Sequence, residues 1–173
     1  MIAAVSATSP GSALPDPTFE AVAVPDARRL FTLALSILRD DGEAEDAVQE
    51  TLLKAWRSWE SVSRMERPGA WLTRVCVNHC ISRRRMLRSR GWPPLPLVED
   101  AAVAGMTRPA ADLLDMERAY RRLSLKQRAA ISLNYRHGYS VEECAVFMGC
   151  RPGTVRAHVA RGLATLRKEL GDD

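Results

Sequence analysis

The chain has 173 residues, of which 46% are apolar, so it can bury the core of one domain or of two small ones. No apolar run approaches the roughly 18 residues that a membrane-spanning helix needs, which excludes membrane insertion as a helix. The formal net charge of +4 conceals two basic blocks: residues 61–90 hold eight arginines and one glutamate, and residues 119–173 hold ten basic and five acidic side chains. Acidic stretches separate these blocks. This arrangement favours two contact surfaces for a polyanion, and the alternative is a set of solvated helices whose net charge differs in sign without a binding role.

The first 25 residues combine short apolar runs with serine, proline and glycine, and no basic segment precedes them. This pattern predicts a mobile tail over residues 1–25 rather than a secretory signal peptide. A cytoplasmic protein is therefore expected, in which the four cysteines are reduced thiols. Pro25 and Asp26 predict the start of a first helix, in which apolar side chains recur at helical spacing as far as Leu38.

A second helix is predicted over residues 43–60, and its inward face is expected to include Ala44, Val48, Trp56 and Trp59. The opposite face is unusual because a leucine lies among charged and polar side chains. That face carries Asp46, Gln49, Glu50, Leu53, Lys54 and Arg57. Such a leucine indicates either a protein contact or an ordinary exposed apolar residue.

A third helix is predicted from Pro68 to about Arg88. The side chains expected to face inward are Leu72, Val75, Cys76, His79, Met86 and Leu87. The other side carries Trp71, Arg74, Asn78, Arg84, Arg85 and Arg88. Arginines bind phosphates, an indole ring stacks on an unpaired base, and a carboxamide reads a base edge. This combination favours single-stranded or melting DNA, although a basic helix face that binds nothing is the alternative.

Three potential metal ligands occur in this third helix, namely Cys76, His79 and Cys80. Their helical spacing places them near one side, which is compatible with zinc or with a thiol-based redox role. No fourth ligand lies nearby, and the side concerned is the apolar one. Small buried thiols and a core histidine are therefore favoured, so no metal or other cofactor is predicted.

The prolines and glycines between residues 91 and 111 predict a flexible linker. Two supporting helices are predicted after it, over residues 112–123 and 126–137, and Tyr135 or Arg136 is expected to turn inward near the end of the second. The fold class predicted is all-α. Two small helical domains, residues 26–90 and 112–170, are expected to be joined by this linker.

The stretch after Tyr139 has the pattern of a helix-turn-helix. Ser140 and Glu143 form a capping box, Gly149 is suited to a left-handed helix end, and Pro152 is suited to the first position of a second helix. The outward face of this second helix carries Gly153, Arg156, Ala157, Ala160, Arg161, Ala164 and Arg167. Arginines flanked by small side chains permit close approach to a DNA major groove, whereas the alternative is an amphipathic surface helix with solvated arginines.

Taken together, three stretches resemble the extracytoplasmic-function group of bacterial RNA polymerase sigma factors. The first is EAEDAVQETLLKAWRSW, residues 43–59. The second is RPGAWLTRVCVNHCISRRR, residues 67–85. The third, LSLKQRAAISLNYRHGYSVEECAVFMGCRPGTVRAHVARGLATLRK, spans residues 123–168. Their order and spacing are more specific than any one of them.

The resemblance implies a role for each stretch. The first would contact core RNA polymerase through Asp46, Gln49 and Glu50, beside Leu53. The second would read the −10 strand through Trp71, Arg74, Asn78, Arg84 and Arg85, and the loop of residues 61–67, which includes Arg64, would hold a flipped base. The third would bind the −35 duplex through Arg151, Thr154, Arg156, Ala157, Ala160 and Arg161.

The chain is thus predicted to be a sigma factor without catalytic activity, which binds core RNA polymerase and promoter DNA and is controlled by an anti-sigma factor. Arg151 departs from the family by replacing the usual serine at the helix cap, which removes a side-chain acceptor and leaves the preferred −35 sequence open. The sequence is also compatible with two alternative functions. One is a free-standing helix-turn-helix regulator, and the other is a thiol or zinc sensor.

Overall fold

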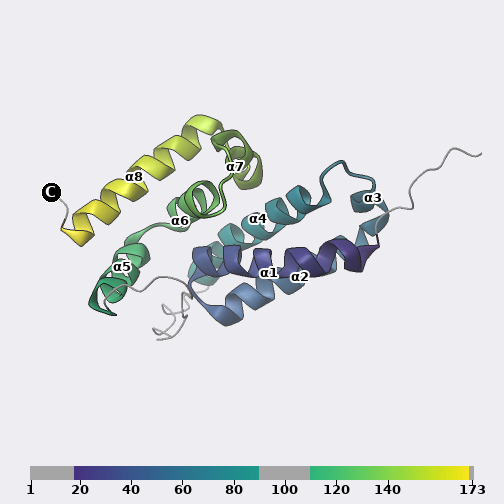
Figure 1. Ribbon diagram of the computed structural model, residues 1–173, viewed down its shortest axis with the longest axis horizontal. Coiled ribbons are helices and arrows are strands. Elements are labelled where there is room, and N and C mark those ends of the chain that lie inside the picture. The colour runs from purple at the N-terminus through teal and green to yellow at the C-terminus, as the bar shows by residue number, and fades with distance from the viewer. Residues whose placement is uncertain (1–17, 90–109, 172–173) are drawn as a thin grey trace, which may run out of the picture.

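The computed structural model describes residues 18–89 and 110–171, and within these ranges the chain is helical and contains no strand (Figure 1). This confirms the predicted all-α fold. The elements are α1 (Phe19–Leu38), α2 (Asp41–Arg57), α3 (Trp59–Ser63), α4 (Pro68–Ser89), α5 (Ala110–Arg122), α6 (Leu125–Ile131), η1 (Ser132–Arg136), α7 (Val141–Met148) and α8 (Pro152–Leu170). None of the helices in these ranges is long and apolar enough to span a bilayer. Residues 1–17 of the predicted tail and 90–109 of the predicted linker lie outside the described ranges.

Helix α1 begins at Phe19, six residues earlier than the predicted start at Pro25. The Thr18 hydroxyl caps it by accepting a hydrogen bond from the backbone N–H of Ala21 at 3.3 Å. Pro25 therefore lies inside the helix, at its seventh residue, where the missing N–H removes one backbone hydrogen bond. The helix ends at Arg39, which adopts the left-handed conformation with φ of 60°.

Helix α2 is capped by the Asp40 side chain, which accepts from the backbone N–H of Glu43 at 2.8 Å. The expectation that Trp56 and Trp59 pack inward is wrong for Trp56, which is 61% exposed, while Trp59 is half-buried. Small residues fill the inward face instead and let α2 approach α1 closely. The buried residues of α2 are Ala44, Ala47, Val48, Thr51 and Ala55.

The buried face of α4 is broader than predicted. Leu72 and Cys76 are buried as expected, but Val75 and His79 are only half-buried. Three further residues, Thr73, Val77 and Cys80, are also fully buried. The reason is that α4 packs against α1 and α2 on one side and against α7 on another. The side chains of Met86 and Leu87 lie outside the part of the chain that the structure describes.

The C-terminal half starts with α5, which packs against α8. Helix α6 opens on a capping box between Ser124 and Gln127 and widens into the single π-helical turn η1, which His137 ends by donating from its backbone N–H to Ser132 at 3.0 Å. Tyr135 and Arg136 are exposed, contrary to the expectation that one of them turns inward. The wider turn changes the direction of the side chains at this end of the helix.

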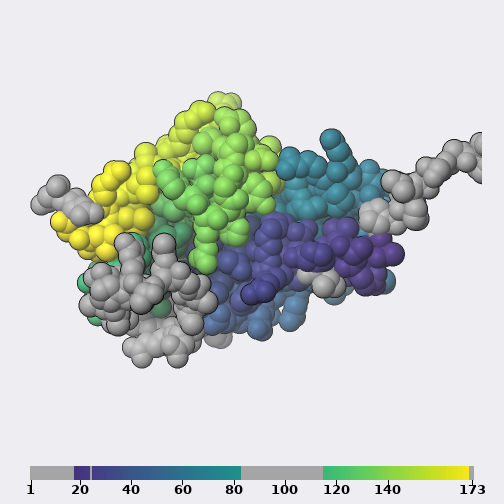
Figure 2. Space-filling view, in the orientation of Figure 1, coloured from purple at the N-terminus to yellow at the C-terminus, as the bar shows by residue number. Residues whose placement is uncertain are grey.

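The two helical groups are not separate bodies in this structure. Helix α7 packs against α4, and α6 and η1 pack against α1. The buried residues of both groups belong to one continuous apolar cluster. In the space-filling view the green segment after α6 rests directly against the purple and teal helices (Figure 2).

A buried arginine joins the groups at one end of this seam. Arg128 of α6 is 2% exposed. It donates to the carbonyl oxygens of Tyr120 at 3.1 Å, Arg121 at 2.9 Å and Ile37 at 3.2 Å. These carbonyls belong to the last turns of α5 and α1, at the negative end of each helix dipole, and the Tyr120 carbonyl also accepts from the backbone N–H of Leu123 at 3.2 Å.

Replacing Arg128 with methionine should destabilise the protein, because the change leaves these carbonyl groups buried without their donor. We expect the free energy of unfolding, measured by urea denaturation, to fall by about 3 kcal/mol. The exposed neighbour Lys126 provides the control, since Lys126→Met should change the free energy of unfolding by less than about 0.5 kcal/mol. Equal stabilities of the two variants would contradict the role given to Arg128.

Candidate nucleic-acid interface

The helix-turn-helix has the geometry that its sequence predicts. Ser140 accepts from the backbone N–H of Glu143 at 3.1 Å, and the Glu143 carboxylate accepts from the backbone N–H of Ser140 at 3.0 Å. Gly149 ends α7 with φ of 62°, a left-handed conformation that costs glycine little. Pro152 then begins α8, with Arg151 at the cap position and no side-chain cap, as expected from its lack of an acceptor.

Helix α8 is held against the domain by Val155 and Gly162, both buried. Gly162 favours close approach, because a Cβ atom there would lie 2.6 Å from Cδ1 of Ile131 in α6, and that side chain would have to shift. The opposite face is open to solvent, as predicted. Its exposed residues are Arg151, Gly153, Thr154, Arg156, Ala160 and Arg161, while Ala157 is half-buried.

The two arginines of this face are held in different ways. Arg156 forms an ion pair with Glu142 of α7 at 3.1 Å, in which both side chains are more than half exposed. Arg161 donates from Nε to the carbonyl oxygen of Ala157 at 3.1 Å. Exposed ion pairs contribute little stability, so Arg156 can exchange its carboxylate for a phosphate or a base edge at small cost.

A second candidate surface lies on α4. Arg74 and Asn78 are exposed, and Trp71 is half-buried with part of its side chain packed against the core. The structure thus brings these three residues to one side of the helix. The side chains of Arg84 and Arg85 lie outside the described residues.

The loop expected over residues 61–67 is shorter than predicted. Its first three residues are helical and end α3, in which Val62 and Ser63 are buried. Residues 64–67 remain exposed between α3 and α4. Arg64, the residue singled out in this loop, forms an exposed ion pair with Glu60 at 3.1 Å.

The third candidate surface is the outward face of α2. Asp46, Gln49 and Leu53 are exposed, the last by 44%, and Glu50 is half-buried and forms an ion pair with Lys54 at 3.6 Å. Sequence reasoning assigned Asp46, Gln49, Glu50 and Leu53 to this face, and the structure places them together on it.

Sequence reasoning missed Trp56 on this face. Its ring lies edge-on to the ring of Phe19, with centroids 5.2 Å apart. Because it follows Leu53 by three residues, the two apolar side chains adjoin on the helix surface. An aromatic and an aliphatic residue ringed by polar groups is the composition of many protein-binding hot spots.

The cysteines of the described residues lie apart from any larger group of potential metal ligands. In residues 18–89 and 110–171, no group of three or more histidine, cysteine, aspartate or glutamate side chains is placed to hold a metal ion. Cys76 and Cys80 are fully buried, and a hydrogen bond from Cys80 lowers the pKa of the Cys76 thiol. Burial raises the pKa of Cys144 to about 11, so that thiol stays protonated at neutral pH.

Comparison with known proteins identifies both helical groups. The family model for sigma-70 region 2 matches residues 25–91, and that for sigma-70 region 4 matches residues 113–166. The ECF RNA polymerase sigma factor SigM of Mycobacterium tuberculosis is 35% identical over 144 residues, which cover 83% of this chain and 72% of SigM. The chain belongs to the extracytoplasmic-function RNA polymerase sigma factors.

Other members of this sigma factor family are similar over comparable lengths. SigL of Mycobacterium tuberculosis is 34% identical over 149 residues, covering 82% of this chain and 84% of SigL. The sigma factor RpoE of Bartonella quintana, solved in complex with the anti-sigma factor NepR, has a TM-score of 0.69 and 31% identity, covering 90% of this chain and 98% of RpoE. The family resemblance stated from the sequence is thus confirmed.

We expect Arg156 and Arg161 of this sigma factor to contribute most to duplex binding, because both project from the exposed face of α8. Replacing either with alanine should weaken binding by about 1–3 kcal/mol if the side chain contacts a base edge. If the arginine contacts only phosphate, its replacement should weaken binding to promoter and scrambled duplexes alike. Fluorescence anisotropy with both duplexes distinguishes the two modes. Wild-type affinity in both variants would show that α8 does not enter the groove.

Proposed function

We propose that this sigma factor binds core RNA polymerase through α2, opens the −10 element with α4 and binds the −35 duplex with α8. The observation that carries the proposal is the presence of three solvent-exposed faces of distinct chemistry on a chain that matches regions 2 and 4 in order. Catalysis is not part of this role, which is exercised in the cytoplasm where polymerase and promoter meet. The working domains are residues 26–90 and 112–170.

Transcription of a cognate promoter by core polymerase, with and without the protein, tests this function. The protein should direct initiation at a limited set of promoters, which can be found by sequencing the transcripts made from genomic DNA. A free-standing helix-turn-helix regulator would instead bind duplex DNA without recruiting core polymerase. Absence of promoter-specific transcripts together with duplex binding would favour that regulator.

An anti-sigma factor is the proposed controlling partner. The supporting observation is that the similar RpoE was solved with the anti-sigma factor NepR, and that RpoE is covered over 98% of its length. The α2 face and the α7–α8 surface are the exposed regions that such a protein would have to cover to block polymerase and DNA. Co-expression with candidate inhibitors and measurement of transcription tests this partner.

The α2 face is proposed as the polymerase contact because Leu53 and Trp56 form an exposed apolar pair among Asp46, Gln49 and Glu50. Leu53→Glu and Trp56→Ala should each weaken core binding by about 2 kcal/mol or more, as expected for hot-spot residues. Both side chains are exposed, so the thermal midpoint should stay within a few degrees of the wild-type value. Native affinity of both variants for core polymerase would remove this assignment.

Promoter opening is proposed to depend on Trp71, whose partly exposed ring adjoins Arg74 and Asn78. Stacking of an unpaired base on an aromatic ring is worth roughly 1–3 kcal/mol. Trp71→Ala should therefore reduce open-complex formation, measured with permanganate, more than it reduces initial promoter binding. Asn78→Ala should act in the same direction with a stronger dependence on the −10 sequence, since a carboxamide reads base edges.

Because Trp71 also packs against the core, its loss could act through stability alone. A promoter with a pre-melted −10 bubble separates the two causes, since the opening cost is already met there. Partial rescue of Trp71→Ala by the bubble supports stacking. A large fall in melting temperature without rescue would leave Trp71 a packing role only.

A further inference from the structure

Three aromatic side chains meet where the start of α1 lies beside α3 and the end of α2 (Figure 1). The ring of Phe19, the first residue of α1, lies edge-on to the ring of Trp56, with centroids 5.2 Å apart and an angle of 80° between the ring planes. The same ring lies edge-on to that of Trp59, with centroids 5.3 Å apart and an angle of 89°. Edge-to-face contact at this separation is a favoured geometry for aromatic pairs. Phe19 therefore links the start of α1 to both tryptophans.

Trp56 has an unusual environment for so large an apolar side chain, because 61% of it is exposed. An exposed side chain on a helix ordinarily samples several rotamers, and fixing it in one of them costs entropy. The edge-on contact with Phe19 restrains the Trp56 indole while leaving most of its surface open to solvent. A side chain that is already fixed loses less freedom on binding, so this arrangement suits a binding residue.

The turn that carries Phe19 precedes residues 25–91, the segment that matches sigma-70 region 2. Ala23 lies one turn further along the same face of α1 and is 4% exposed, which anchors this turn to the rest of the domain. Pro25 removes one of the helical hydrogen bonds that would hold the turn. The position of the Phe19 ring therefore depends on side-chain packing and on the Thr18 cap.

We propose that Phe19 is a positioning residue for polymerase binding, because it holds the Trp56 indole in one orientation beside Leu53 on the exposed face of α2. The proposal rests on the polymerase contact proposed above. Phe19 acts through Trp56, and its own half-buried ring supplies orientation to the indole. Core polymerase thus meets an indole whose orientation is set before binding.

Replacing Phe19 with alanine tests this role, since alanine removes the ring and favours the helix. We expect the Kd for core polymerase to rise about two- to tenfold, which corresponds to the loss of one aromatic pair. Phe19→Tyr keeps the ring and should bind like the wild type. Glu20→Ala is the matched control, because it changes an exposed residue in the same turn, and it should leave the Kd unchanged.

A double-mutant cycle with Trp56→Ala shows whether Phe19 acts through Trp56. In the Trp56→Ala background, Phe19→Ala should cause no further loss of affinity, because no indole is left to position. Equal losses in both backgrounds would overturn the proposal, since Phe19 would then touch polymerase itself or act through the stability of α1. Wild-type affinity of the Phe19→Ala single variant would overturn it as well.

Fluorine NMR of protein labelled with 5-fluorotryptophan gives a readout that does not need polymerase. The resonance of Trp56 is identified by its absence from Trp56→Ala. Phe19→Ala should shift and narrow this resonance, because the indole loses its neighbouring ring and gains rotational freedom. Glu20→Ala should leave it in place. A Trp56 resonance that is the same in Phe19→Ala and the wild type would show that Phe19 does not hold the indole.

These outcomes are distinguishable from failure of the proposed function. If Trp56→Ala weakens binding to core polymerase and Phe19→Ala does not, only the positioning role is refuted. If Trp56→Ala and Leu53→Glu both bind core polymerase with native affinity, the α2 face is not the contact. The positioning role is then refuted together with the contact, whatever the NMR shows of the restraint on the indole.

Discussion

The position of the helix-turn-helix depends on one buried guanidinium. Arg128 places a positive charge where the carbonyl ends of α5 and α1 converge, and donates to three of their backbone carbonyl groups. Its contact with Ile37 sets α6 against α1, and α6 in turn supports α8 through the close approach at Gly162. Helix α8 is therefore positioned by the hydrogen bonds of Arg128 to backbone groups together with its own close packing against α6.

The seam between the two groups combines apolar packing with several polar contacts. Arg39 forms an ion pair with Glu117 and lies over the Tyr120 ring, 5.6 Å from its centroid, while Ser36 and Ser132 share a hydrogen bond. Polar groups of this kind regain water when an interface opens, whereas apolar surface does not. Interfaces between domains that move are accordingly more polar than permanent ones.

Much of the local structure could be predicted because its signals act over three or four residues. Ser140 and Gly149 bound α7 as expected, and the exposed face of α8 follows from its helical period. The exposure of Trp56 could not be predicted from hydrophobicity, because the alanines of α2 bring α1 too close to leave room for an indole ring between the two helices. The seam was equally out of reach, because Arg29 and Tyr139 are 110 residues apart and no local pattern links them.

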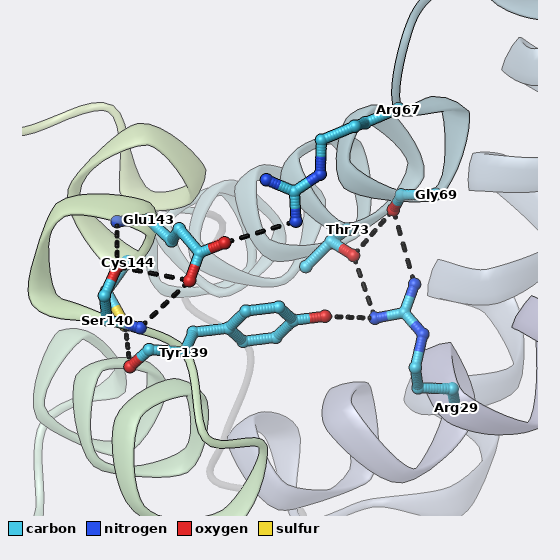
Figure 3. A network of polar contacts seen from close by, with 8 residues as sticks. All are labelled: Arg29, Arg67, Gly69, Thr73, Tyr139, Ser140, Glu143 and Cys144. Carbon is cyan, nitrogen blue, oxygen red and sulfur yellow. Dashed lines mark hydrogen bonds and ion pairs between the residues drawn. The ribbon is translucent and has the colours of Figure 1, made fainter.

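Two adjacent acidic residues connect helix formation with recognition. Glu142 and Glu143 lie in the first turn of α7, where negative charge stabilises the positive end of the helix dipole. Each also holds an arginine: Glu142 pairs with Arg156 of α8, and Glu143 pairs with Arg67, just before α4 (Figure 3). Any DNA phosphate that takes either arginine must first displace a carboxylate. That exchange weakens contact with phosphates of every sequence, so base-edge contacts gain relative weight in selecting the promoter.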